Sequence, residues 1–172
     1  MININKDDCC FCEACINICP TKAIVPVRDD CGYYYPRIEP EKCINCNQCE
    51  KVCQIGKKSA TNIPKKVFAA RVKNENIYQK SASGGLASII TKHVLGKKGV
   101  VYGCAYTDSG FAHIRISSEK EWEKLAGSKY VQSNLGMIYT DIKDDLDKDR
   151  TVLFIGLPCQ ITGIKMFLKK EY

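Results

Sequence analysis

Eight cysteines stand in two runs with identical spacing, and they are the strongest chemical signal in the sequence. In each run, two residues separate the first three cysteines and three residues precede the fourth, and the second run follows the first by 34 residues. Three cysteines in such a tight loop can bind three corners of one [4Fe–4S] cubane, while the fourth reaches a second cluster. The runs are Cys9, Cys12, Cys15 and Cys19, and then Cys43, Cys46, Cys49 and Cys53.

The fourth cysteine of each run is expected to cross to the other cluster. This rule predicts one cluster on Cys9, Cys12, Cys15 and Cys53, and another on Cys43, Cys46, Cys49 and Cys19. Pro20 follows Cys19, as in bacterial two-cluster ferredoxins. Gln54 takes that place after Cys53, which we expect to change the local turn without costing the ligand.

Two other uses of cysteine fit less well. Disulfide frameworks suit small secreted domains, and the start of the chain, Met1–Asp8, lacks the basic and then apolar pattern of a signal peptide. Structural zinc sites use two cysteine pairs, whereas each run here is a complete set of four. The spacing therefore favours two [4Fe–4S] clusters over zinc or disulfides.

Four of the twelve cysteines lie outside this spacing. Cys10 and Cys31 are interpreted as small buried or turn residues, and Cys104, in an apolar run, as a core residue. Cys159 stands in Gly156–Gln160, between an expected buried strand and a helix, where the helix dipole lowers the pKa of a thiol. Two interpretations of Cys159 stay open: a buried thiol at a turn, or a functional thiol or metal ligand beside a cofactor.

The segments around the cysteine runs predict a small β-α-β arrangement repeated once. Short strands are expected over 23–27 and 33–39, joined by a turn over 28–32 in which Gly32 adopts a positive φ. Helical turns are expected over 13–19 and 48–53. Apolar residues expected to pack around the clusters are Ile16, Ile18, Ile24, Ile38, Ile44 and Val52.

After a polar segment, Gly56–Pro64, the pattern changes to alternating strands and helices. Strands are expected over 67–72, 99–106, 112–117 and 152–155, and helices over 86–95, 119–125, 135–146 and 161–170. The two histidines, His93 and His113, form no ligand set, and each is expected to be a surface or satisfied core residue.

We therefore predict an α+β protein: a bacterial two-[4Fe–4S] ferredoxin-like module over residues 1–58, a linker over 59–65, and an α/β domain with a mixed sheet over 66–172. The sequence stops at Tyr172 directly after an expected helix. We interpret the chain as a fragment that lacks its C-terminal part.

Charge separates the two predicted domains. Residues 1–58 hold eight basic and eight acidic side chains, so the whole formal charge of +7 lies in the remainder. Two oxidised clusters with their thiolates would add about −4 to the first domain. The basic residues are interleaved with acids, so we expect no nucleic-acid partner. No apolar run approaches the length of a membrane span, and we expect a cytoplasmic location.

Four motifs of the second domain occur in an order that is similar to one known family. They are Ser83–Gly85 before a helix, Val101–Tyr106, Gly127–Ser133 and Val152–Gln160. In this order they resemble the beta subunit of the coenzyme F-420-reducing hydrogenase and its dehydrogenase relatives. The resemblance covers about residues 66–172.

The resemblance implies an iron–sulfur flavoprotein oxidoreductase subunit that passes electrons between its clusters and FAD. It implies flavin contacts by Ser83, Gly84 and Gly85, and by Lys129 and Gln132, and a role for Cys159 at the flavin or a further cluster. A shared cleft for Cys159 and Ser83–Gly85 is expected. The partners implied are a redox protein or a low-potential electron donor. The main alternative is a carrier or adaptor without flavin, and a more distant one is an iron–sulfur sensor.

Overall fold

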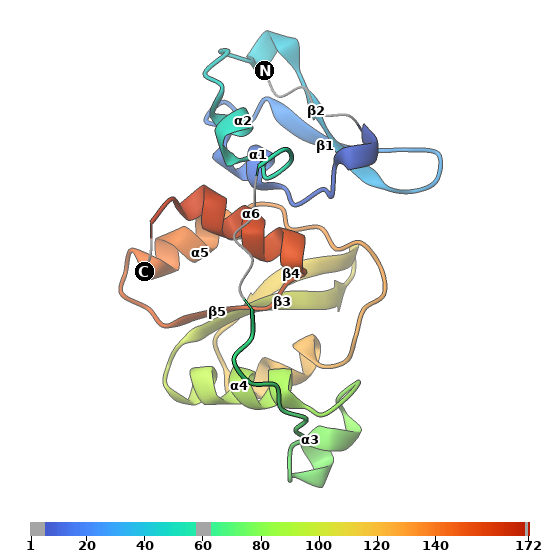
Figure 1. The fold of residues 1–172 in the computed structure, drawn as a ribbon, viewed down its shortest axis with the longest axis vertical. Helices are drawn as coiled ribbons and strands as arrows, with labels where there is room; N and C mark the ends of the chain where they lie inside the picture. Colours follow the sequence, from blue (N-terminus) through green and yellow to red (C-terminus); the bar gives the residue numbers. More distant parts are fainter. Residues whose placement is uncertain (1–5, 58–62, 171) are drawn as a thin grey trace. The chain divides into compact units, whose positions relative to one another are not determined.

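The computed structural model describes residues 6–57, 63–170 and 172, which form two compact units (Figure 1). The first unit combines the described part of Met1–Lys57 with Asn134–Asp144 and the described part of Gly156–Tyr172. The second combines the described part of Lys58–Ser133 with Asp145–Ile155. The domain boundaries expected from the sequence remain a prediction about which segments fold together, and residues 59–62 of the expected linker lie outside the described residues.

A two-stranded antiparallel sheet in the first unit pairs β1 (Ile24–Arg28) with β2 (Tyr34–Ile38). Its register sets Ile24 opposite Ile38 and Arg28 opposite Tyr34. Gly32 has φ +92° in the connecting turn, and its carbonyl oxygen accepts a hydrogen bond from Arg28 Nε at 3.0 Å. Both strands and the glycine turn confirm the prediction.

Short helices flank this sheet. They are η1 (Lys6–Asp8), α1 (Ala14–Ile18), η2 (Pro40–Lys42) and α2 (Gln48–Val52). The five-residue helices α1 and α2 contact each other. They match the helical turns predicted inside the two cysteine runs.

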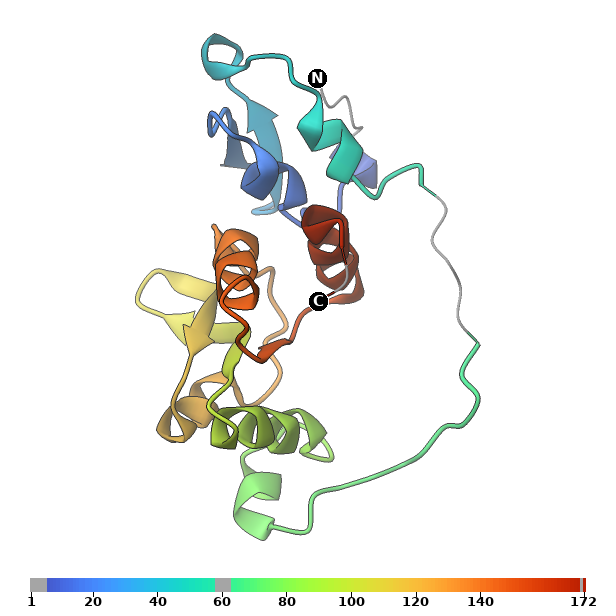
Figure 2. The ribbon, with the colours of Figure 1, turned by 90° about the vertical axis from the view of Figure 1, so that its left-hand side faces the viewer.

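The other helices of the first unit come from late in the sequence. They are α6 (Pro158–Leu168) and the part of α5 (Ile138–Leu146) up to Asp144. Helix α6 packs against α1 and α2, as Figure 2 shows. Its start is well defined because Pro158 occupies the first turn and Gln160 Oε1 accepts a hydrogen bond from the Leu157 N–H at 2.8 Å.

A three-stranded mixed sheet forms the centre of the second unit, with strand order β4-β3-β5. The long strand β3 (Val100–Thr107) pairs antiparallel with β4 (Gly110–Ile116) and parallel with β5 (Val152–Phe154). The mixture of helices with a mixed sheet confirms the predicted fold class at this level.

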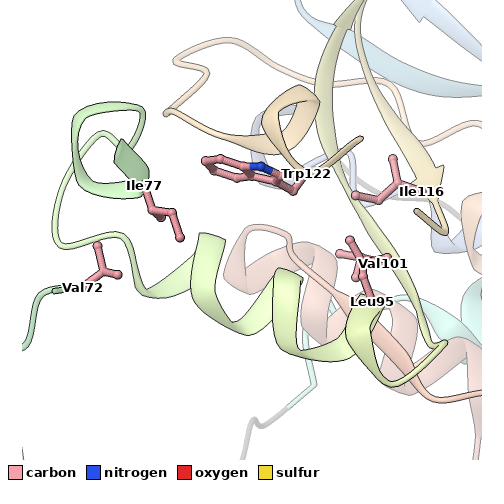
Figure 3. Close-up of a cluster of buried hydrophobic side chains, with 6 residues drawn as sticks. All are labelled: Val72, Ile77, Leu95, Val101, Ile116 and Trp122. Carbon is pink, nitrogen blue, oxygen red and sulfur yellow. The ribbon is translucent and has the colours of Figure 1, made fainter. Parts of the chain in front are cut away.

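Helices α3 (Glu75–Gln79), α4 (Leu86–Gly96) and η3 (Glu119–Leu125) complete the second unit. Side chains from these helices, the strands and the segment before α3 meet in one apolar core (Figure 3). The core residues drawn there are Val72, Ile77, Leu95, Val101, Ile116 and Trp122. Trp122 is the single tryptophan of the sequence, so it is a natural optical probe of this unit.

The strand expected over 67–72 is wrong. Val67 and Phe68 are exposed and no strand pairs with them in the described part of the chain. Only Val72 is buried, and its N–H donates to the Gly84 carbonyl at 2.7 Å. An apolar run does not become a strand unless a sheet edge is free beside it.

Two further differences concern helices. The segment 119–125 is a 3-10 helix, and the helix expected from residue 135 begins at Ile138. None of the helices in the described ranges is both long and apolar enough to cross a membrane.

Candidate iron–sulfur site

A cavity in the first unit gathers three cysteines of the first run with the last cysteine of the second. Its volume is about 360 Å³. Cys9, Cys12 and Cys15 line it from the loop before and the start of α1, and Cys53 lines it from the end of α2. The wall is completed by Cys10, Phe11, Glu13, Ala14, Pro36, Gln54 and Ile55.

A second cavity, of about 370 Å³, gathers the complementary set. Cys43, Cys46 and Cys49 line it from the loop before and the start of α2, and Cys19 lines it from the end of α1. Ile24, Ile38 and Ile44, three of the apolar residues expected around the clusters, also line this cavity. The structure thus brings the eight predicted cysteines together in the two crossed sets of four.

The backbone conformation repeats with the same 34-residue offset as the two cysteine runs. Left-handed conformations occur at Phe11 and Glu13 (φ 48° and 59°) and recur 34 residues later at Asn45 and Asn47 (φ 53° and 55°). Non-glycine residues rarely adopt a positive φ. The paired occurrence shows that each run coils its backbone in the same way around its own cavity.

The described residues contain no group of three or more His, Cys, Asp or Glu side chains that could share a single metal ion. A [4Fe–4S] cubane needs a different ligand arrangement, because each of its four irons binds one thiolate. Its four ligands therefore lie farther apart than the ligands of a single metal ion. Each cavity is lined by one of the two crossed sets of four ligand-spaced cysteines, so both fit cubanes by the chemistry and the number of these donors.

Burial raises the pKa of the Cys9, Cys15 and Cys53 thiols, because a thiolate loses hydration there. Cys19 differs. Burial acts to raise its pKa, but hydrogen bonds outweigh this, and the Cys19 pKa lies below its ordinary value. The Ala23 N–H approaches the Cys19 sulfur at 3.3 Å and the Thr21 hydroxyl lies 3.7 Å from it.

Gln54, the residue that stands where the ferredoxin pattern has proline, joins two elements of the first unit. Its Nε2 donates to the Cys159 carbonyl oxygen at 2.9 Å and to the Cys10 sulfur at 3.4 Å. The Cys10 side chain is the main cause that lowers the pKa of the Cys159 thiol to about 7. Cys10 is exposed and lies outside any turn, so its interpretation as a buried or turn residue is wrong, whereas Cys31 lies in the β1–β2 turn.

Glu13 and Asn17 are functional candidates that the sequence did not reveal. The Glu13 carboxylate is buried and accepts hydrogen bonds from the N–H groups of Leu135 and Gly136 at 2.8 and 3.0 Å. Burial raises its pKa to about 7. The Asn17 amide donates to Gly136 O at 2.8 Å and accepts from the Tyr139 N–H at 3.2 Å. Both residues hold the segment before α5 against the first cysteine loop.

The loop expected to contact flavin lies in the second unit. Ser83 is exposed, and Gly85 begins α4 with φ +78° and without a side-chain cap. A Cβ on Gly84 would lie 2.3 Å from Ala70 O, and one on Gly85 would lie 2.6 Å from Val72 Cγ1. Both glycines are therefore required by the close approach of the preceding chain.

Lys129 and Gln132, from the second motif, also lie in the second unit. Gln132 is exposed, while the Lys129 ammonium donates to the carbonyl oxygens of Ala126 and Gly127 at 2.7 and 3.2 Å. Burial lowers the Lys129 pKa. Cys159 belongs to the first unit, so the cleft expected to join it to Ser83–Gly85 stays a prediction.

The remaining sulfur and imidazole groups have local structural partners. Cys104 is half-buried on β3, directly opposite His113 on β4. The His113 ring lies 3.0 Å from the Ser133 hydroxyl and 3.2 Å from Ile155 O. Burial lowers the His113 pKa, so this is a satisfied core histidine, as predicted, and His93 is exposed.

Comparison with known families divides the chain at about residue 60. Residues 2–25 and 36–56 match the model of the 4Fe–4S binding domain. Residues 67–138 match the N-terminal model of the coenzyme F-420 hydrogenase/dehydrogenase beta subunit.

Two curated proteins are similar to this chain over different shares of its length. The chain is 42% identical over 55 residues to an uncharacterized polyferredoxin-like protein of Methanocaldococcus jannaschii, covering 27% of this chain and 33% of that protein. It is 23% identical over 177 residues to one component of the F(420)H(2) dehydrogenase of Methanosarcina mazei, covering 95% of this chain and 49% of that component. The chain thus spans a third to a half of the length of these relatives.

Proposed function

We propose that the chain is the electron-transfer part of an iron–sulfur flavoprotein oxidoreductase of the coenzyme F-420 hydrogenase/dehydrogenase beta-subunit-like family, whose N-terminal model matches residues 67–138 behind the 4Fe–4S binding sequences. The observation that carries this proposal is the pair of cavities, each lined by four ligand-spaced cysteines from both runs. The donor, the acceptor and the partner complex belong to the same proposal, since the matches cover only a third to a half of the relatives.

In this proposal the eight ligand-spaced cysteines hold two [4Fe–4S] clusters, in the crossed sets that line the two cavities. Such a cluster supplies one-electron transfer when bound. The chain tunes the site around Cys19, where Ala23 and Thr21 direct hydrogen bonds to the sulfur. Hydrogen bonds to a ligand sulfur disperse its negative charge, so we expect the site of Cys19 to have the higher potential of the two.

FAD is the proposed second cofactor, and it supplies exchange of two electrons as a hydride. Ser83, Gly84 and Gly85 would hold it at the start of α4, where an exposed hydroxyl stands beside a helix N-terminus that lacks a side-chain cap. Lys129 and Gln132 are its other proposed contacts, and Cys159 at the flavin remains part of the proposal.

An electron carrier without flavin is the second candidate function. One observation favours it: several residues proposed to contact flavin already have structural roles within the second unit. Gly84 and Gly85 are required by the nearby chain, and Lys129 bonds to carbonyl groups of its own loop. In that case the second unit would only dock the iron–sulfur part to a redox partner.

An anaerobic reductive titration of the reconstituted chain with FAD separates the two functions. The flavoprotein function predicts about four electrons per chain, of which two enter the clusters and two enter the flavin. Ser83→Asp should weaken FAD binding at least about tenfold through repulsion of the phosphates, because an added charge opposes the anion at close range. The matched control is Ser109→Asp in an exposed loop. About two electrons per chain and no retained FAD would favour the carrier.

A further inference from the structure

The two cysteine loops have the same backbone conformation but differ in their exposure to solvent. We call residues 9–15 the first cysteine loop and residues 43–49, which follow by the 34-residue offset, the second cysteine loop. In the first loop, Phe11 and Glu13 are only 5% and 2% exposed. Their counterparts in the second loop, Asn45 and Asn47, are both exposed. The repeat is therefore symmetric in sequence and asymmetric in its surroundings.

The late segments of the first unit account for the burial of the first cysteine loop. The Glu13 carboxylate accepts hydrogen bonds from the N–H groups of Leu135 and Gly136, in the segment before α5. A Cβ on Gly163 would lie 3.2 Å from Cys12 Sγ, so α6 packs directly against the same loop. A redox partner approaching from solvent would meet these segments before it reached the first cavity.

The second cysteine loop, in contrast, separates the second cavity from solvent by single side chains. Ile44 is 62% exposed and Cys46 is exposed, yet both residues line the cavity. An iron–sulfur group held there would therefore lie one side chain below the surface. Ile44 also supplies an exposed apolar side chain, of the kind that serves as an anchor in the centre of an interface.

Charge indicates which kind of partner fits this surface. Residues 39–50 contain three acidic side chains, Glu39, Glu41 and Glu50, and one basic side chain, Lys42. The Lys42 ammonium is already paired with the Glu39 carboxylate at 2.6 Å. Among the described residues that line the second cavity there is no Lys, Arg, Asp or Glu. Four thiolates with an oxidised cubane would add about −2, so the surface around Ile44 is negative.

We propose that the second cysteine loop is the docking surface for a protein that accepts single electrons and presents a basic face around an apolar pocket for Ile44. This inference rests on the proposed iron–sulfur function. One electron is exchanged: the partner's centre is reduced, the iron–sulfur site is oxidised, and no bond or proton changes. Opposite charges steer the two proteins together. The hydrogen bonds to the Cys19 sulfur support the same site, because they favour an added electron there.

Ferricytochrome c, a basic protein that accepts one electron, is the probe for docking, and its zinc-substituted form measures binding without electron transfer. The full chain loaded with iron should bind it more weakly as the salt concentration rises. Ile44→Lys should weaken binding at low salt at least about tenfold, because it sets a positive charge against the basic face. Tyr33→Lys, at a turn residue that is 58% exposed, is the matched control and should change binding less than about threefold.

A second variant keeps this test valid if Ile44→Lys loses iron. Glu41 is exposed and lies outside the cavity wall, so Glu41→Lys reverses a charge beside the loop without altering the site itself. We expect it to weaken binding several-fold while about eight irons are retained.

Iron release measures the difference in exposure without any partner. Anaerobic chelation of the loaded chain should remove about four irons at least about tenfold faster than the other four, because only the second site lies near solvent. Cys12→Ala, which leaves the second site intact, should show only the fast phase. Cys46→Ala, which leaves the first site intact, should show only the slow phase.

The outcomes separate this proposal from the proposed function. Fast release in Cys46→Ala, or equal binding by Ile44→Lys and Tyr33→Lys, would overturn the docking surface while about eight bound irons uphold the iron–sulfur function. Eight irons without FAD would refute the flavoprotein function and leave the docking surface supported by its own tests. A chain that takes up no iron would refute both.

Discussion

Cys19 belongs to the first cysteine run but lines the second cavity, and this crossing is a testable property of a single residue. We expect Cys19→Ala to reduce the iron content from about eight to about four, because the cluster on Cys43, Cys46 and Cys49 loses one ligand. Iron analysis together with the electron paramagnetic resonance spectrum of the reduced protein measures this loss.

Double variants make the crossing explicit. Cys19→Ala with Cys46→Ala damages one cluster twice and should still retain about four irons, whereas Cys19→Ala with Cys12→Ala should retain almost none. The reverse pattern would assign Cys19 to its own run. Cys31→Ala serves as the control for removal of a non-ligand cysteine.

Asp145 is the charged centre of the second unit. It accepts hydrogen bonds from the Tyr102 hydroxyl at 2.6 Å and from Arg115 Nε and Arg150 Nη1 at 2.7 and 2.8 Å. Burial acts to raise its pKa, but Arg115 and Tyr102 outweigh this and hold the Asp145 pKa below its ordinary value. Asp145→Asn should lower the free energy of unfolding at pH 7 by about 1–3 kcal/mol, because the buried Tyr102 loses its charged acceptor.

The pH dependence of this effect has a definite sign. A carboxyl group whose folded pKa is depressed stabilises the fold above its unfolded pKa, and this contribution is lost as the pH falls through the folded value. The difference between the unmodified chain and Asp145→Asn should therefore shrink below about pH 4. Denaturation followed by Trp122 fluorescence measures it, with the exposed Asp108→Asn as control. A difference independent of pH would refute the electrostatic explanation.

At the scale of elements, Glu13 connects the first cysteine loop to the segment before α5. Glu13→Gln keeps the size of the side chain but removes the charge from two hydrogen bonds, those from the N–H groups of Leu135 and Gly136. Charged acceptors make the stronger bonds, so above the Glu13 pKa of about 7, where the carboxylate is ionised, amide hydrogen exchange at residues 135 and 136 should accelerate about tenfold or more. Glu41→Gln on the exposed surface is the control. Unchanged exchange at both amides would mean that other contacts hold this segment.

The same contact explains which elements could be predicted from the sequence. The strands β1 and β2 were predictable because alternation and the Gly32 turn are local signals. The start of α5 was not, because its first N–H groups donate to Asn17 and the segment before it donates to Glu13, both more than a hundred residues earlier. The failed strand at 67–72 has the same cause: a strand needs a partner edge that the local pattern does not specify.

The candidate site likewise has a part that local sequence predicts and a part that depends on contacts between distant segments. The eight ligand cysteines could be found because their spacing is a local property of two tight loops. The hydrogen bonds of Gln54 to Cys10 and to the Cys159 carbonyl depend on how α6 packs against the cysteine loop, and the cysteine spacing does not predict that packing. Gln54 left a partial signal, since it departs from the proline of the ferredoxin pattern.

At the scale of the whole molecule, cluster loss should act on one unit and spare the other. Binding of the clusters contributes to folding, because the large apolar side chains buried within residues 6–57 are only Phe11, Ile24 and Val52. Removal of iron by anaerobic chelation should therefore abolish the hydrogen-exchange protection of β1, β2 and α6 together. The Trp122 core should keep its cooperative unfolding transition, since it lies in the second unit.

The response of α6 tests this prediction most directly, because α6 lies late in the sequence but belongs to the first unit. If α6 stays protected while the cysteine loops unfold, the late helices fold with the second unit, as the linear division at residues 59–65 predicts. If Trp122 changes in step with iron loss, the two units form one cooperative structure.

The central claim is that the two cysteine-lined cavities hold two cubane clusters, and metal analysis tests it most directly. Anaerobically purified or reconstituted chain should contain about eight irons and eight acid-labile sulfides and take up about two electrons without flavin. Stoichiometric zinc without acid-labile sulfide would contradict the account.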